Sequence, residues 1–243
     1  MHTKGNMTFF FSERDQFSNW FISEFEVKGV RFNCVEQFMM YCKAKLFGDE
    51  STANAIMAAT HPRDQKALGR SVAGYDDAVW CSRRARIVAH GCYAKFSQNE
   101  VLRKALLDTG DTVLVEASPY DRIWGVGLAE HDPRVLDPRQ WKGQNLLGVA
   151  LIEVREKLVA ELSAKTTTET DEQLLRSLAL VPKFGISKVQ RLCTWGYNRA
   201  ARKVDELLLS GKIQQVGETP YLYRVCASLA GDITSQALNP KHE

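Results

Sequence analysis

The sequence predicts an α+β protein with two domains, a larger helix-rich one followed by a small one of three helices and a hairpin. In several long stretches, apolar residues recur three or four positions apart, the spacing of one helical face. Residues 8–11 and 112–116 are rich in aromatic and β-branched residues, which is typical of strands. Residues 163–170 contain no large apolar side chain, and we interpret them as a linker between the domains.

These observations place the first domain at residues 7–162 and the second at residues 171–226. We expect residues 1–6 to be frayed. Residues 227–243 show no periodicity and are predicted to form a disordered tail.

In the first domain, strands are predicted at residues 8–11 and 112–116, with a hairpin that turns at Lys28-Gly29. Helices are predicted at residues 35–47, 51–59, 62–68, 75–96, 100–107 and 146–162. In the second domain, helices at residues 172–180, 187–193 and 197–209 precede a ribbon of residues 213–216 and 221–225. Three helices followed by a hairpin are the order of elements in a winged helix.

Composition excludes several classes of protein. The net charge of +3 over 243 residues is too small to identify a nucleic-acid binder, so any basic surface must be local. The six cysteines form no C-x-x-C pair, which disfavours zinc and predicts free thiols. Without a signal-like start or an apolar run near 18 residues, a cytoplasmic location is expected. No P-loop, dinucleotide-binding or G-x-S-x-G motif is present, and no cofactor is predicted.

The predicted helix at residues 35–47 carries charges where apolar residues are expected. Glu36 and Lys43 are seven residues apart, nearly two turns, so they share a face and lie roughly 10 Å apart along the axis. That gap suits a substrate better than a direct ion pair. The alternative is that both charges lie at the solvated edge of the apolar stripe.

These residue types suggest cleavage of a glycosidic bond. Such cleavage needs acid assistance to the leaving group and stabilisation of positive charge at the anomeric carbon, which two carboxylates, here Glu36 and Asp121, can supply. A lysine held near Met40 and Phe47 would lose solvation and its pKa would fall, so Lys43 could attack a sugar aldehyde to form an imine. Trp20, Trp80 and Trp124 are candidate substrate-contacting rings, or ordinary core aromatics.

Several short motifs resemble those of one known family, in the same order. They are Phe17-Ser18-Asn19, Glu36 with Lys43, Leu68-Gly69-Arg70, Trp80, Ala94-Lys95-Phe96, Leu114-Val115-Glu116, Asp121 with Trp124-Gly125, and Gly143-Gln144-Asn145-Leu146-Leu147-Gly148. Together they resemble the NADAR (YbiA-like) family over about residues 9–158.

This resemblance implies a helix-rich α+β fold with a small antiparallel sheet, and cleavage of N-glycosidic bonds. By the same resemblance, Glu36 is an acid/base, Asp121 assists opening of the sugar ring, and Lys43 forms a Schiff base with the opened ribose. Substrate contacts are implied for Asn19, Trp80, Trp124, Gly125 and Asn145, although each asparagine taken alone is more typical of a turn or cap residue. Residues 126–141 lengthen one loop relative to shorter members, and Gln37 stands where histidine is common, which leaves the choice of substrate open.

The second domain carries a basic run with its own likeness. Residues 183–203 include six lysines and arginines and no acid, which indicates a DNA-binding surface or a solvated face. Gly196-Tyr197-Asn198-Arg199-Ala200-Ala201-Arg202 and the preceding helix resemble the C-terminal gamma domain of FtsK-type DNA translocases, a winged helix. The likeness implies that Asn198, Arg199 and Arg202 face base edges while Lys188 and Arg191 contact phosphate.

Three functional hypotheses follow. The first is an N-glycosidase that removes ADP-ribose from guanine in DNA, held on DNA by the second domain; such an enzyme could be the antitoxin of a cognate ADP-ribosyltransferase toxin. The second is an N-glycosidase of ribosylamino-pyrimidine phosphates from riboflavin synthesis. The third is a transcription regulator that senses a nucleotide, which the presence of Glu36, Lys43 and Asp121 disfavours.

Overall fold

The computed structural model describes residues 1–217, 221–227 and 229, and its contacts divide the chain into two units, residues 1–160 and 161–243. Most of the tail predicted at residues 227–243 therefore lies outside the described residues. In the described part of the chain, none of the helices is both long and apolar enough to cross a bilayer.

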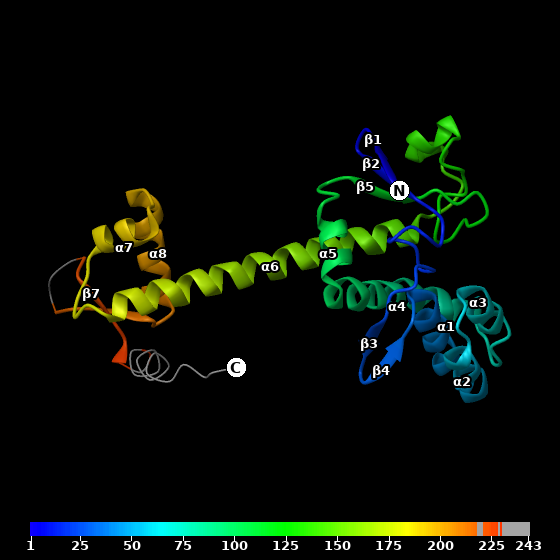
Figure 1. The fold of residues 1–243 in the computed structure, drawn as a ribbon, viewed down its shortest axis with the longest axis horizontal. Coiled ribbons are helices and arrows are strands. Elements are labelled where there is room, and N and C mark those ends of the chain that lie inside the picture. Colours follow the sequence, from blue (N-terminus) through cyan, green and yellow to red (C-terminus); the bar gives the residue numbers. More distant parts are fainter. Residues whose placement is uncertain (218–220, 228, 230–243) are drawn as a thin grey trace. The chain divides into compact units, whose positions relative to one another are not determined.

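The first unit contains a small mixed sheet and a separate hairpin (Figure 1). Strand β2 (Met7–Phe10) pairs antiparallel with β1 (His2–Lys4) and parallel with β5 (Val113–Glu116). The predicted fraying of residues 1–6 is therefore wrong, because β1 completes the edge of this sheet. The expected antiparallel sheet is also corrected: the long connection through the helices lets β5 return parallel to β2. Strands β3 (Phe25–Val27) and β4 (Val30–Phe32) form the predicted hairpin.

Five helices fill the connection between the hairpin and β5, as the periodicity predicted. They are α1 (Val35–Leu46), α2 (Glu50–Ala58), α3 (Pro62–Arg70), α4 (Asp77–Gln98) and α5 (Glu100–Leu107). Each begins at a side-chain N-cap, for example Asp76, which accepts a hydrogen bond from the backbone N–H of Val79. Helix α1 packs against α2, α3 and α4 and supplies much of the main core, including Val35, Phe38 and Met39.

The lengthened loop between β5 and α6 (Leu146–Ala179) packs with the mixed sheet in a small core that is separate from the main one. It contains two short 3₁₀ turns, η1 (Pro133–Leu136) and η2 (Pro138–Gln140). Val126, Leu128 and Val135 from this loop are buried against Met7 and Phe9 of β2. The insertion therefore covers one side of the mixed sheet.

The predicted linker at residues 163–170 is helical. A single helix, α6, runs through it and joins the helices expected at residues 146–162 and 172–180. After Gly148 this stretch contains neither glycine nor proline, so nothing breaks the helix. Lys165 and Glu169 form an i,i+4 ion pair of 3.8 Å within it. A stretch without large apolar residues therefore does not by itself predict a break in the helix.

The second unit is built from the end of α6, α7 (Ile186–Cys193), α8 (Tyr197–Leu209) and a ribbon of β6 (Ile213–Gln215) and β7 (Tyr223–Val225). Its core includes Leu178, Val189 and Val204, one from each helix, all fully buried. The order of elements agrees with the sequence-based expectation. Its identification as a winged helix stays a prediction.

Asn145 fixes the junction between β5 and α6. Its side chain accepts a hydrogen bond from the backbone N–H of Glu116 (3.0 Å) and donates one to the backbone oxygen of Leu114 (2.8 Å). Its backbone lies in the left-handed region, with φ of 51°, which asparagine tolerates better than most residues. One side chain therefore joins the last strand of the sheet to the start of α6.

We predict that Asn145→Ala lowers the free energy of unfolding by about 2 to 4 kcal/mol, because two buried backbone groups lose their partner and alanine is strained at this φ. Asn145→Gly loses the same two hydrogen bonds but tolerates this φ, so it should cost about 1 kcal/mol less than Asn145→Ala. Urea denaturation measures both, with Asn54→Ala on the exposed side of α2 as the control. Equal stability of Asn145→Ala and wild type would show that the junction does not depend on this side chain.

Candidate active site

A cleft of about 1100 Å³ opens in the first unit and brings together most of the predicted site residues. Its walls come from residues 11–20, α1, α3, α4, the end of β5 and the loop that follows. Among the predicted residues, those that line it are Glu36, Lys43, Trp80, Asp121 and Trp124. Trp20, a candidate from its position in the sequence, lines it as well.

Glu36 lies in the first turn of α1 and is 2% exposed. Its backbone N–H donates to the oxygen of Asn19 (3.0 Å), and its Oε2 accepts a hydrogen bond from the indole Nε1 of Trp20 (3.2 Å). Its Oε1 is buried without a hydrogen-bond partner among the described residues. Burial raises the pKa of Glu36 to about 7, against the opposing effects of Lys66 and the Trp20 hydrogen bond. Near neutral pH this carboxyl can therefore both give and take a proton.

Glu116, at the end of β5, is a second carboxyl of this kind and was not among the predicted site residues. Its Oε2 is also buried without a partner in the described part of the chain. Burial raises the pKa of Glu116 to about 8, the charge of Asp121 acts in the same direction, and Lys66 opposes both. The sequence offered one signal, an acid that ends the strand motif Leu114-Val115-Glu116 just before the turn-rich loop.

Asp121 is held in the cleft by the loop after β5. Its Oδ1 accepts hydrogen bonds from the backbone N–H groups of Ile123 and Trp124, both at 2.8 Å. Its own N–H donates to the hydroxyl of Ser118 (3.1 Å). Its Oδ2 lies 3.9 Å from Nζ of Lys66. The two backbone bonds fix the carboxylate, and Oδ2 remains available to a substrate.

Lys43 lies two turns after Glu36 on α1, and both side chains line the cleft, as their spacing predicted. Its Nζ donates to the backbone oxygen of Gly69 (2.7 Å) and lies 4.2 Å from the ring centroid of Tyr75 and 5.7 Å from that of Trp80. Burial lowers the pKa of Lys43, and the nearby charge of Asp77 opposes this shift. The aromatic neighbours are therefore Tyr75 and Trp80 rather than the predicted Phe47.

Two further lysines shape the site and were not predicted from the sequence. Lys66 of α3 lies 5.6 Å from the ring of Trp20, beside Asp121, where its charge favours ionised carboxylates. Lys95 is 1% exposed and donates to the backbone oxygen of Ser18 (2.9 Å), which fixes the segment that carries Trp20. Burial lowers the pKa of Lys95 to about 8. Lys95 belongs to the family motif Ala94-Lys95-Phe96, but the local pattern of α4 did not show that its side chain is buried.

Three predicted substrate-contacting residues do not line the cleft. Asn19 is buried, and its Oδ1 lies 3.9 Å from the thiol of Cys92. Gly125 packs so closely that a Cβ there would lie 2.8 Å from the backbone oxygen of Glu116. Asn145 is the junction residue described above. Gln37 also faces away: its amide donates to the backbone oxygens of Ile56, Met57 and Ala59. These residues support the site through packing and hydrogen bonds and do not line the cleft themselves.

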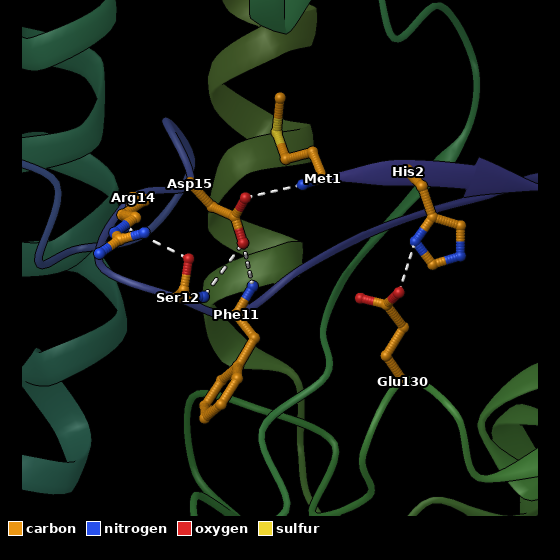
Figure 2. A network of polar contacts seen from close by, with 7 residues as sticks. All are labelled: Met1, His2, Phe11, Ser12, Arg14, Asp15 and Glu130. Carbon is orange, nitrogen blue, oxygen red and sulfur yellow. Dashed lines mark hydrogen bonds and ion pairs between the residues drawn. The ribbon is translucent and has the colours of Figure 1, made fainter.

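The rim of the cleft at residues 11–14 is organised by Asp15 (Figure 2). Asp15 accepts hydrogen bonds from the backbone N–H groups of Phe11 (2.8 Å) and Ser12 (3.0 Å) and from the amino group of Met1 (2.7 Å). The backbone N–H of Arg14 donates to the Ser12 hydroxyl (3.3 Å). This network places Arg14, which lines the cleft with four other basic side chains, Lys43, Lys66, Arg70 and Arg122.

The predicted DNA-contacting residues all lie in the second unit. Asn198 and Arg202 are exposed and, four residues apart, share one face of α8. The guanidinium of Arg199 lies 4.3 Å from the centroid of the Trp195 ring, and both residues line one hollow with Arg202. On α7, Lys188 is half-buried and Arg191 is exposed, with its Nε donating to the backbone oxygen of Ser187 (3.3 Å). Asn198 and Arg202 thus share a face of α8, and Arg199 lies beside Arg202.

No group of three or more His, Cys, Asp or Glu side chains in the described ranges is arranged to hold a metal ion. All six cysteines are free thiols, as expected. The ionisable groups that the cleft brings together are two protonatable carboxyls, the fixed carboxyl group of Asp121 and the desolvated amine of Lys43.

Comparisons with known proteins agree with this arrangement. The NADAR domain model matches residues 9–159. Protein irg-1 of Caenorhabditis elegans is 39% identical over 169 residues, which cover 63% of this chain and 80% of that protein. An N-glycosidase of Acanthamoeba polyphaga mimivirus is 40% identical over 146 residues, 58% of this chain and 86% of the relative.

A solved structure is similar as well. The NMR structure of Escherichia coli YbiA matches with a TM-score of 0.54 and 29% identity, over 66% of this chain and 89% of that one. YbiA from the same species carries the name N-glycosidase and is 30% identical over 155 residues. The motifs, the fold and the cleft carry the same conclusion: the chain belongs to the NADAR domain family and is a hydrolase that acts on N-glycosyl bonds.

Proposed function

We propose that this cleft removes ADP-ribose from guanine bases in DNA, and that the second unit holds the enzyme on DNA. The observation that carries the proposal is the pairing, in one cleft, of Glu36, whose Oε1 is buried without a described partner, with the desolvated amine of Lys43. An acid and a latent nucleophile are the groups that imine-forming N-glycosidic cleavage requires.

The chemistry begins with opening of the ribose ring. As the C1–O4 bond breaks, Glu36 gives its proton to the ring oxygen and C1 becomes an iminium on the guanine nitrogen, with its positive charge stabilised by Asp121. Unprotonated Lys43 adds to C1 and passes a proton to Glu36, which donates it to the guanine amine, and this amine leaves as C1 becomes an iminium on Lys43. Water then adds to C1, and Glu36 takes its protons in turn and returns one to the Lys43 nitrogen, so that Lys43 departs as the free amine, ADP-ribose and unmodified guanine are released, and Glu36 is again protonated.

The dimensions and charges of the cleft support a substrate larger than a pyrimidine nucleotide. A volume of about 1100 Å³ lies at the upper end of small-molecule sites. Arg14, Arg70 and Arg122 line it in addition to Lys66, and arginine suits the bidentate binding of phosphate oxygens. A diphosphate flanked by two sugars would fill this volume and pair with these cations better than a ribosylamino-pyrimidine phosphate would.

The second unit supports DNA as the carrier of the modified base. Lys188, Arg191, Asn198, Arg199 and Arg202 supply the donors that phosphate and base edges accept. Lys203, by contrast, is committed to ion pairs with Asp171 (3.1 Å) and Glu206 (2.6 Å) and would not contact DNA. An enzyme of free nucleotides would have no use for such a surface.

We predict that Glu36→Gln and Lys43→Ala each lower turnover of a guanine-ADP-ribosylated oligonucleotide by about 10²-fold to 10⁴-fold, because one removes the acid and the other the nucleophile. Mass spectrometry of the released ADP-ribose measures the rate. Borohydride should trap a covalent adduct on Lys43 in wild type and none in Lys43→Ala.

The matched control is Lys45→Ala, which removes an exposed lysine from the same helix and should change neither rate nor trapping. If wild type leaves the oligonucleotide intact but cleaves ribosylamino-pyrimidine phosphates, the substrate assignment is wrong and the riboflavin-intermediate hypothesis replaces it. Rapid turnover without any trapped adduct would rule out the imine.

The role of Glu116 as a neutral carboxyl can be tested by its effect on stability. Its pKa is about 8 in the folded protein against a usual 4.5, so the folded state binds its proton more tightly. The resulting stabilisation is complete below about pH 4.5 and is lost as the pH rises through 8. We therefore predict that Glu116→Gln is less sensitive than wild type to a rise from pH 5 to pH 9 in urea denaturation. Parallel pH dependences would show that Glu116 is ionised in the folded protein at neutral pH.

The role of the second unit predicts a separate effect. Combining Lys188→Ala, Arg191→Ala and Arg202→Ala should raise KM for a modified DNA duplex, with little change in kcat, because these side chains bind ground state and transition state alike. The slope of log affinity against log salt should fall by about 0.9 for each phosphate that is no longer neutralised. Cleavage of free ADP-ribosyl-guanosine should be unaffected. Lys165→Ala, exposed on α6, is the control, and an unchanged KM for duplex would refute the tethering role.

A further inference from the structure

A second hollow, of about 650 Å³, lies in the first unit between the β3–β4 hairpin, α1 and α4. We call it the hairpin pocket and define it by its rings and its two arginines: Phe32, Phe38, Tyr41, Arg83, Arg86 and His90. Its volume is within the range of sites for single small molecules. Neither the N-glycosidase chemistry nor the proposed DNA contacts make use of it.

The hairpin pocket is separate from the catalytic cleft although both border α1. Glu36 and Lys43 line the cleft, whereas Tyr41 and Lys45 line the hairpin pocket. Lys45 is nine residues after Glu36, which at about 100° per residue places it on the opposite side of the helix. A ligand in the hairpin pocket would therefore touch the helix that carries the acid and the nucleophile without entering the cleft.

The floor of the hairpin pocket is aromatic. The ring of Phe32 packs edge-on against Phe38, with centroids 5.1 Å apart, and against Tyr41 at 5.4 Å. His90 is tilted by 34° over Phe38 at 5.8 Å. Tyr41 is half-buried and His90 exposed, so both present ring surface to the pocket. Flat apolar groups such as nucleobases stack on surfaces of this kind.

The rim is cationic and unpaired. Lys28, Arg83 and Arg86 are exposed, and no hydrogen bond or ion pair joins any of the three to another described residue. Lys45 also lines the pocket but is occupied by Glu50. No acidic side chain is among the described lining residues. Positive charges gathered without a counter-charge repel one another, and an anion between them relieves this. Two guanidiniums one turn apart match the oxygens of a phosphate.

From this floor and rim we propose that the hairpin pocket binds a free nucleoside 5′-phosphate, with its base on the rings of Tyr41 and His90 and its phosphates on Arg83 and Arg86. An aliphatic acid would satisfy the charge but not the rings, and a nucleoside would satisfy the rings but not the charge. Its volume of about 650 Å³ suits one such molecule, which favours a free nucleotide over a strand. This binding site is independent of the proposed substrate of the cleft.

The test is a titration of the full chain with adenosine 5′-diphosphate, followed by NMR of the His90 ring protons. His90→Gln assigns these resonances. We expect a saturable shift of the His90 signals, with a Kd raised about tenfold or more in the double variant Arg83→Ser and Arg86→Ser, since charged hydrogen bonds are lost. Arg84→Ser, from the same helix but outside the pocket lining, should bind as wild type does. Adenosine and decanoate should bind at least about tenfold more weakly than the diphosphate.

Three results would overturn the proposal. The first is an absence of any His90 shift while diphosphate binds elsewhere. The second is equal affinity of the double variant and wild type at the His90 signals. The third is tighter binding of decanoate, or of a single-stranded oligothymidylate, than of the diphosphate, since these would identify a fatty-acid site or a nucleic-acid strand instead. Circular dichroism of the double variant verifies that its fold is intact.

Discussion

The carboxyl group of Glu36 is buried in the first unit and accepts one hydrogen bond, from Trp20. The proposed acid chemistry of the cleft depends on the contacts that keep this carboxyl buried. An ionised carboxylate in such surroundings costs several kcal/mol, so the group retains a proton to higher pH. The segment that carries Trp20 is in turn held by Lys95, buried and bonded to the oxygen of Ser18. A chain of buried polar contacts thus fixes the acid in its protonatable state.

Close approaches between backbone segments position the other two carboxyl groups of the cleft, those of Glu116 and Asp121. At the junction of β5 and α6, a Cβ on Gly148 would lie 2.0 Å from the backbone oxygen of Leu114, and one on Gly143 would lie 2.3 Å from that of Gly125. Glycine is required at both positions because no side chain fits. The motif that contains Gly143, Asn145 and Gly148 is therefore structural: it joins β5 to α6 and so positions Glu116 and Asp121 in the lining of the cleft.

In the second unit, acidic side chains from outside residues 183–203 lie among the basic ones. Residues 183–203 carry no acid, yet Lys203 is neutralised by Asp171 from α6 and by Glu206. Asp205 also shares the outer face of α8 with Asn198 and Arg202, by the helical period. The basic surface is accordingly narrower than the sequence alone suggested.

The sequence by itself determined the elements that arise from local periodicity. The helices α1 to α5, the β3–β4 hairpin, and the shared face of Glu36 and Lys43 follow from spacing within one element, and the family motifs indicated the reaction class. Tertiary structure decided what depends on contacts between distant residues. The parallel pairing of β5 with β2, the raised pKa of Glu116 and the structural role of Asn145 each require partners far along the chain, which no local pattern specifies. The unbroken helix through residues 163–170 was missed for another reason. A stretch without large apolar residues does not show whether a helix continues through it or ends, and the absence of glycine and proline allows this helix to continue.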